Sequence, residues 1–470
     1  MLKLSPSGSR GFIDRARAVE ITEEWLAQIR ENQQDLTALE LVLTDKSYTP
    51  DAAQVIADFV TSTEHFHPCL AHRVISLDMS DVIARQYTED GLAVLQTFAQ
   101  AFANASTLQH LNLSDNAMGS RGMPCCEALF NASHPLKSLS LCNNGLSLEA
   151  MQQVADWLVS RELAPHLQKV HFFNNMSGDD GCKAFQHLIN HCSPIHLSNL
   201  RYASTRASVL GSQCIVTGLA ELVQRVDEGE GASMTHLDLT DNKFQGENAQ
   251  ILAQALRAMP LLEYINLSEC DMEDEGLHVI CSALLEHKHI THLDLSGNCI
   301  TAEGVSFHSP FIQLLKKISP NLKVLNIQDN EMTSKGVASV TRVLSRGPSV
   351  LVALRLGCNE CGPNGTTHLI PNADSFLPTL ECLDMNGNYL SDDALEKLAE
   401  TFGDALQALD DNLDDSDFED ASVEEEEVEE EEEIEGVEKE EDEEEEEEDE
   451  EEDDVDELTK TLSQVAFNGW

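Results

Sequence analysis

Apolar residues recur along this chain in a short repeated spacing, L-x-x-L-x-L-x-x-N. The residues Leu108, Leu111, Leu113 and Asn116 form one copy, and the spacing returns every 28 to 38 residues. The alternating L-x-L core of each copy predicts a short strand with one buried face. Eight copies end in asparagine and four carry another residue in that slot: Asn116, Asn144, Asn175, Asn242, Asn298, Asn330, Asn359 and Asn388, then Thr44, Val82, Thr205 and Cys270.

The asparagine stands where the chain must turn away from the strand. Its amide donates and accepts hydrogen bonds, so we expect it to hold the backbone of its own turn and of the next repeat. An amphipathic stretch follows the turn and predicts a helix. Residues 246–259 are the example, because their apolar residues recur on one helical face: Ile251, Leu252, Ala255 and Leu256.

A period near 28 residues leaves room for a strand and a full helix in each unit, which is typical of the long leucine-rich repeat. We therefore predict an α/β fold, a right-handed leucine-rich-repeat solenoid of about twelve repeats. Like the ribonuclease-inhibitor horseshoe, it would have parallel strands inside and helices outside. The predicted boundaries are an N-terminal cap over residues 1–36, with a helix at 21–32, and a repeat domain over residues 37–409.

The net charge of −55 is distributed unevenly. Residues 410–457 contain 35 acidic residues and one lysine, Lys439. Strong self-repulsion and few apolar residues predict that this acidic tail is disordered. Residues 458–470 regain apolar character and form a short C-terminal segment. So acidic a surface repels nucleic acid and anionic membranes, and we expect basic protein surfaces among its partners.

Several classes of protein are excluded by what the sequence lacks. No apolar run approaches the ~18 residues of a membrane span, so we expect no membrane insertion. There is no phosphate-binding G-x-x-x-x-G-K-S/T loop, and the pair Cys358 and Cys361 lacks the second pair that zinc needs. We therefore expect no metal, no cofactor and no stand-alone enzyme. The 13 cysteines without framework spacing are typical of reduced thiols in the cytosol or nucleus.

Polar residues at the strand-to-helix turns are the candidate functional groups. Residues 80–90 (SDVIARQYTED) replace the usual turn by a longer loop with one arginine, Arg85. Two asparagine doublets each hold one asparagine beyond the structural slot, so Asn143 and Asn174 are free to point at the rim. The alternative is a solvated arginine and polar residues that the turns merely tolerate.

These segments resemble the Ran GTPase-activating proteins, most closely the plant-type members. The resemblance covers the chain from about Val74 to the tail and rests on four segments together: LNLSDNAMGSRG (111–122), LCNNGL (141–146), FFNNMSGDDG (172–181) and YASTR (202–206). It implies that the chain accelerates GTP hydrolysis by the small GTPase Ran. The partner would be Ran in its GTP-bound form together with a Ran-binding protein, and GTP and magnesium would belong to Ran.

The resemblance also implies roles for particular residues. The family's essential arginine, which follows a glycine, falls on Arg85, although Ala84 replaces the glycine. The family's functional asparagine falls on Asn143, with Cys142 in place of histidine. Asn143 would hold the GTPase's own glutamine, which positions the attacking water, and Arg85 would organise the interface; an arginine finger is its alternative role. Further partner-binding candidates in the same turns are Asp81, Asp115, Asn174, Arg206 and Asp241.

Departures from the family bear on location. Plant members begin with an envelope-targeting domain and animal members add a C-terminal domain, and this chain has neither. We therefore expect a cytoplasmic or perinuclear protein without stable anchoring at the nuclear envelope. The alternative function is an acidic leucine-rich-repeat binding protein or histone chaperone without GTPase-activating activity. Such proteins have fewer and shorter repeats, so the ~28-residue period argues against them.

Overall fold

The structure is a computed structural model that describes residues 1–32, 37–64, 66–131, 133–226, 231–346 and 349–412. The predicted tail beyond Asn412 and the apolar segment 458–470 lie outside the described residues. Within the described part of the chain, no helix is both long and apolar enough to cross a membrane.

Thirteen parallel strands form one continuous sheet within the described part of the repeat domain. Each strand pairs in register with the strand of the next repeat, so that Leu111 lies between Leu77 and Leu139. Two further strands, β2 (Gly11–Ile13) and β4 (Lys46–Tyr48), form a small separate sheet. The main sheet contains β1 (Leu2–Leu4), β3 (Leu39–Val42), β5 (Val74–Asp78), β6 (His110–Asn112), β7 (Ser138–Ser140), β8 (Lys169–Phe173), β9 (Asn199–Ala203), β10 (His236–Asp238), β11 (Tyr264–Asn266), β12 (His292–Asp294), β13 (Val324–Asn326), β14 (Ala353–Arg355) and β15 (Cys382–Asp384).

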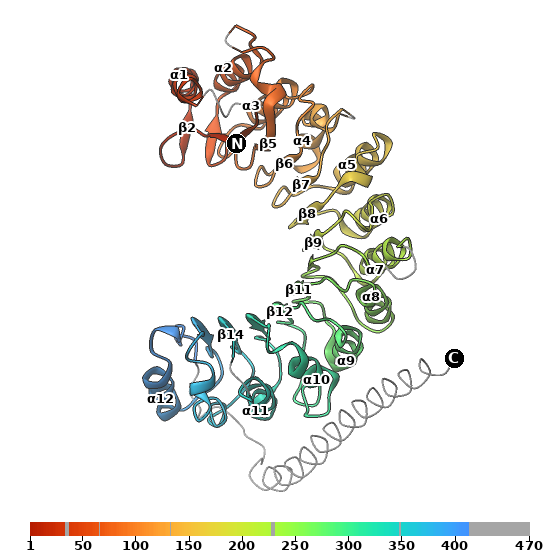
Figure 1. Ribbon diagram of the computed structural model, residues 1–470, viewed down its shortest axis with the longest axis vertical. Coiled ribbons are helices and arrows are strands. Elements are labelled where there is room, and N and C mark those ends of the chain that lie inside the picture. The colour runs from red at the N-terminus through yellow and green to blue at the C-terminus, as the bar shows by residue number, and fades with distance from the viewer. Residues whose placement is uncertain (33–36, 65, 132, 227–230, 347–348, 413–470) are drawn as a thin grey trace, which may run out of the picture. The chain divides into compact units, whose positions relative to one another are not determined.

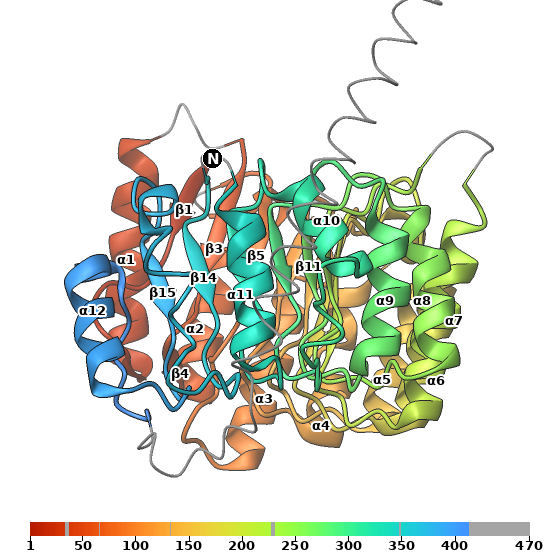
Figure 2. The same cartoon turned by 90° about the horizontal axis from the view of Figure 1, so that it is seen from below.

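Helices connect these strands and lie on the outer side of the sheet (Figure 1). Neighbouring helices contact one another side by side along the repeat domain (Figure 2). The α/β leucine-rich-repeat solenoid is therefore confirmed, with strands on the concave face and helices on the convex face of residues 1–412. The helices are α1 (Arg15–Glu31), α2 (Pro50–Thr61), α3 (Thr88–Ala101), α4 (Gly119–Cys125), α5 (Leu148–Ser160), α6 (Gly178–Ile189), α7 (Val209–Val223), α8 (Glu247–Arg257), α9 (Glu273–Leu284), α10 (Pro310–Ile318), α11 (Thr333–Leu344) and α12 (Asp392–Phe402), with short 3-10 helices η2 (Leu70–Arg73), η3 (Glu127–Phe130), η4 (Ala164–His166), η5 (Ala373–Ser375) and η6 (Gly403–Ala405).

The helix expected at 246–259 is α8, which buries Leu252, Ala255 and Leu256 as the pattern predicts. One unit departs from the expected strand-and-helix plan. Between β14 and β15 the chain forms only turns and η5. Prolines at 363, 371 and 378 explain this, because a proline inside a helix removes a hydrogen bond and clashes with the preceding turn.

The N-terminal segment also differs from the expected cap. Its helix α1 begins at Arg15, before the predicted start at residue 21, because the Asp14 carboxylate accepts from the Arg17 N–H (2.9 Å) and caps the helix there. Strand β1 was not predicted, and it extends the sheet beyond β3. The register of β3 with β5 pairs Leu41 with Leu77, which puts Lys46 in the asparagine slot and shows that the assignment of Thr44 to it is wrong.

The predicted role of the slot asparagines is confirmed. Asn298 is fully buried, and its Nδ2 donates to the carbonyls of Leu295 in its own repeat and Leu267 in the preceding one (2.9 Å each). Its Oδ1 accepts from the Cys270 N–H at 3.0 Å. Asn330 repeats the arrangement one turn later, where its Oδ1 accepts from the Asn298 N–H at 2.9 Å. These side chains therefore join consecutive turns through groups that no solvent reaches.

A second device joins the helix of one repeat to the turn of the next. The Asp274 carboxylate, in the first turn of α9, accepts from the Thr301 N–H (2.9 Å) and hydroxyl (2.6 Å). Gly304 lies so close that an added Cβ would stand 2.1 Å from the Asp274 Oδ1. A side chain at this position would therefore displace the carboxylate from Thr301.

We expect Gly304→Ala to lower the free energy of unfolding by about 1–3 kcal/mol, because overpacking breaks this link. Urea denaturation followed by circular dichroism measures the change. Gly11→Ala is the matched control, since only the Ser9 carbonyl, at 3.7 Å, lies near the added Cβ. Equal stability of the two variants would contradict the proposed clash.

Candidate functional site

The residue directly before the asparagine slot has the same unusual backbone conformation in each described repeat from β3 to β15. All twelve have φ between 49° and 71°, the left-handed region that glycine, asparagine and aspartate tolerate best. Each lies at the carboxyl end of a strand, where the turn begins. We call these residues the rim row: Asp45, Asp81, Asp115, Asn143, Asn174, Ser204, Asp241, Glu269, Gly297, Asp329, Cys358 and Gly387.

The rim row contains five of the residues that the sequence marks as candidates: Asp81, Asp115, Asn143, Asn174 and Asp241. A backbone ladder aligns successive members. The Asn143 N–H donates to the Phe173 carbonyl (2.8 Å), and equivalent bonds link neighbouring turns. Consecutive side chains are therefore displayed at the spacing of the strands, about 4.8 Å.

Three members of the rim row form a chain of hydrogen bonds through their exposed side chains. The Asn143 Nδ2 donates to the Asp115 Oδ1 at 2.7 Å, and the Asn174 Nδ2 donates to the Asn143 Oδ1 at 2.9 Å. A carboxylate only accepts hydrogen bonds, so this chain fixes which end of the Asn143 amide faces Asp115. One N–H and one oxygen lone pair of Asn143 remain for a partner.

Arg85 lies on a loop that neighbouring repeats hold in place. The Val82 N–H donates to the Asn116 Oδ1 (2.9 Å), and the Gln86 side chain donates to the Tyr48 carbonyl. Arg85 itself is exposed, has φ of 60° and forms no ion pair with the described residues. Its guanidinium is thus available to a partner, two strands away from Asn143 along the sheet.

The other candidates are not brought together with Asn143. Asp81 forms an ion pair with Arg10 (2.5 Å), so a side chain of the chain itself already engages it. Arg206 is exposed in the turn after β9, and Asp241 is half-buried after β10. The structure places both farther along the same edge of the sheet as Asn143, without a direct contact to it in the described part of the chain.

Cys142 is half-buried beside Asn143. Burial raises the pKa of its thiol, and the hydrogen bond with Ser114 and the Arg201 charge oppose that rise. The thiol is therefore protonated at neutral pH and is a poor nucleophile. Among the described residues, no group of three or more histidine, cysteine or acidic side chains is arranged to hold a metal ion.

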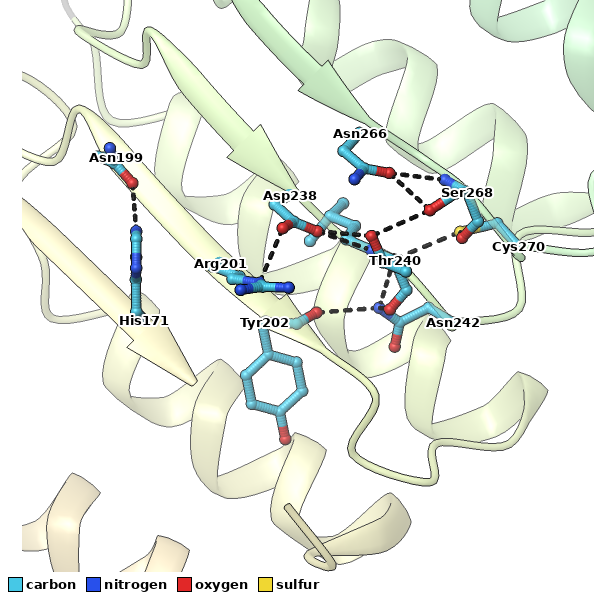
Figure 3. Close-up of polar contacts among 11 residues, drawn as sticks. His171, Asn199, Arg201, Tyr202, Asp238, Thr240, Asn242, Asn266, Ser268 and Cys270 are labelled. Atoms are coloured by element: carbon cyan, nitrogen blue, oxygen red, sulfur yellow. Dashed lines mark hydrogen bonds and ion pairs between the residues drawn. The ribbon is translucent and has the colours of Figure 1, made fainter. Parts of the chain in front are cut away.

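The polar network on the concave face was missed at the sequence level. The Arg201 guanidinium lies 3.6 Å from the centre of the Phe173 ring. It also pairs with the Asp238 carboxylate at 2.8 Å (Figure 3). Asp238 also accepts from the Thr240 hydroxyl at 2.7 Å. In the sequence, Arg201 and Asp238 are simply polar residues between two apolar residues. The repeat pattern does not fix the residue type at these positions, so it could not predict the network.

Comparison with known proteins supports the class that the fold defines, a leucine-rich-repeat protein. The family model described as leucine rich repeat matches residues 104–123, 232–250, 258–281, 286–307, 319–340 and 376–399. The chain is 28% identical over 279 residues to human "NACHT, LRR and PYD domains-containing protein 13". The aligned region covers 59% of this chain and 25% of that protein. It thus spans about a quarter of the length of the curated relatives it matches.

A second relative is the Arabidopsis thaliana "RAN GTPase-activating protein 2". It is 31% identical over 152 residues, which is 31% of this chain and 26% of that protein. Among solved structures, the tropomodulin C-terminal domain of Caenorhabditis elegans covers 34% of this chain and 93% of its own, with 18% identity and a TM-score of 0.28.

Proposed function

We propose that this chain activates GTP hydrolysis by the small GTPase Ran and so supports transport between nucleus and cytoplasm. The observation that carries the proposal is the fixed amide of Asn143, held at the edge of the sheet between Asp115 and Asn174. The similarity to the Arabidopsis Ran GTPase-activating protein supports it. The chain would act in the cytoplasm and supply no cofactor, since GTP and magnesium belong to Ran.

In this mechanism Asn143 orders a glutamine of the GTPase. Its free N–H and free lone pair match the oxygen and the N–H of a second amide, so the two amides can pair. A glutamine held in this way positions the attacking water, and positioning alone contributes several kcal/mol of barrier lowering. Asp115 and Asn174 act as positioning residues because they fix the Asn143 amide before the partner arrives.

Arg85 would organise the interface instead of reaching the phosphates. Its loop is anchored by Asn116 and Tyr48, so the exposed guanidinium meets a partner at a fixed place on the rim. Arginine at such a position makes paired hydrogen bonds with carboxylates. Asp81, Arg206 and Asp241 would add contacts along the same edge.

A binding protein without GTPase-activating activity is the second candidate. The matches to NACHT, LRR and PYD domains-containing proteins favour it, because the matched region of the human protein covers 59% of this chain. In this case the concave face would bind a protein partner and Asn143 would have no catalytic consequence.

Single-turnover hydrolysis of GTP bound to Ran separates the two candidates. The measurement compares Ran alone, Ran with the chain, and Ran with the chain and a Ran-binding protein. We expect an acceleration on the order of 10³–10⁵, the range that activators of small GTPases reach. Unchanged hydrolysis at saturating protein would reject the proposed activity and leave the binding function.

A further inference from the structure

Four basic residues lie on, or directly before, the neighbouring strands β6 to β8 of the concave face. His110 is on β6, Lys137 directly precedes β7, and Lys169 and His171 are on β8. The register places His110 opposite Ser138 and Ser138 opposite Lys169, so that only a short side chain separates the two basic residues. We call these four residues, His110, Lys137, Lys169 and His171, the basic strip.

The two lysines of the basic strip lack the ion pairs that several lysines on the outer helices form. Lys183 pairs with Asp180 at 2.7 Å and Lys397 with Asp393 at 2.6 Å, both on the outer helices. Within the described residues, neither Lys137 nor Lys169 forms an ion pair. Lys137 and Lys169 are therefore uncompensated by nearby carboxylates, in a chain with 84 acidic and 29 basic residues.

The histidines report the same uncompensated charge. Burial lowers the pKa of His110, and the charges of Lys137 and Lys169 lower it further. Burial also lowers the pKa of His171, where Lys169 and Arg201 add to the effect and the hydrogen bond to Asn199 opposes it. Burial and the lysine charges therefore both disfavour protonation of these imidazoles, and an anionic ligand would favour it.

The surroundings limit the size of that ligand. Asp78 lies on β5 at one side of the strip, and Asp238 pairs with Arg201 on the other side. At about 4.8 Å per strand, the strip is only about 10–15 Å wide. A duplex nucleic acid presents phosphates every ~1.7 Å along its axis and would press some against these carboxylates. A single extended polypeptide fits between them.

We propose that the basic strip is a docking site for an acidic segment of a partner protein. Glutamate or aspartate side chains of the segment would pair with Lys137 and Lys169, and His110 and His171 would donate further hydrogen bonds when protonated. This site lies on the strands next to the rim row and does not depend on the proposed GTPase activation, since it requires only binding.

The test uses the full chain and a fluorescein-labelled peptide of about twelve residues that alternates glutamate and glycine. Fluorescence anisotropy at 0.15 M salt measures binding, because the Debye length of ~8 Å then screens the distant negative charges of the chain. We expect saturable binding that Lys137→Gln with Lys169→Gln weakens about fivefold to tenfold, because the two half-buried lysines would each lose an ion pair with the peptide.

Lys183→Gln with Lys397→Gln is the matched control, because it removes the same charge from the outer helices and should leave the affinity unchanged. Lys137→Arg with Lys169→Arg should retain binding. Absence of binding by the natural chain, or equal weakening in both glutamine variants, would overturn the proposal. So would tighter binding of a duplex oligonucleotide of matched charge than of the acidic peptide.

Discussion

Replacing Asn143 with alanine is expected to lower the acceleration of Ran GTP hydrolysis about a hundredfold or more. The reason is geometric: without the amide, the glutamine of the GTPase loses its support, and misplacement of a reacting group by ~1 Å costs about a hundredfold in rate. Single-turnover hydrolysis at saturating protein gives the rate. The concentration that gives half the maximal rate should change little, because one side chain at the rim contributes little to the whole interface.

The left-handed backbone at Asn143 requires a second variant, since φ is 53° and alanine is strained there. Asn143→Gly removes the side chain without strain, and it should lose as much rate as the alanine variant. Glu269→Gly makes the same change at another member of the rim row and should retain the full rate. Acceleration that survives both Asn143 substitutions would remove this residue from the mechanism, even if the chain activates Ran.

Asp115 and Asn174 should affect the rate of GTP hydrolysis only by holding the Asn143 side-chain amide in place. Asn174→Gly frees the Asn143 oxygen, and Asp115→Gly frees its Nδ2, so each lets the amide rotate without straining the left-handed backbone. We expect intermediate losses of rate from both. Arg85→Ala should instead raise the half-saturating concentration, since the arginine is expected to organise the interface.

The largest expected loss of stability follows from Asn298→Ala. It leaves the Leu267 carbonyl and the Cys270 N–H buried without their partner, and it leaves the Leu295 carbonyl with only the Asn330 Nδ2 at 3.3 Å. Each buried polar group without a hydrogen bond costs about 1–3 kcal/mol, so we expect the free energy of unfolding to fall by about 3 kcal/mol or more. Urea denaturation measures the total, and hydrogen exchange should show faster exchange first in the turns after β11 and β12.

Asn321→Ala is the matched control, because its exposed amide makes a single bond to the Lys288 carbonyl at 3.3 Å. It should change the free energy of unfolding by less than about 0.5 kcal/mol, as surface substitutions generally do. Equal free energies of unfolding for the two variants would contradict the role assigned to the buried Asn298 amide. Since each repeat contacts only its neighbours, the effect of Asn298→Ala should stay local in hydrogen exchange.

The sequence predicts the repeats well because each strand and slot asparagine is a local pattern. Leu111, Leu113 and Asn116 are enough to place a strand and its turn. The absence of a full helix before β15 could also have been predicted, because three prolines interrupt that repeat. Strand β1 could not, because three residues carry too little pattern and pair only with a partner 37 residues away.

The candidate site was predictable in part. The doublets in the sequence identify Asn143 and Asn174 as extra polar residues in their turns. Their contact depends on the register between repeats of unequal length, which no local pattern encodes. The basic strip could not be predicted for the same reason. Lys137 and Lys169 lie 32 residues apart in the sequence, and only the pairing of β7 with β8 brings them close together.

The left-handed rim row restricts which amino acids the edge of this protein can display. No β-branched residue stands at any of its twelve positions, and most are aspartate, asparagine or glycine. A substitution among these few residue types changes the chemistry of one turn and leaves the backbone of the next turn undisturbed. Specificity at this edge can therefore diverge one turn at a time while the scaffold stays the same. The short polar side chains that the conformation allows favour partners that offer amides or cations.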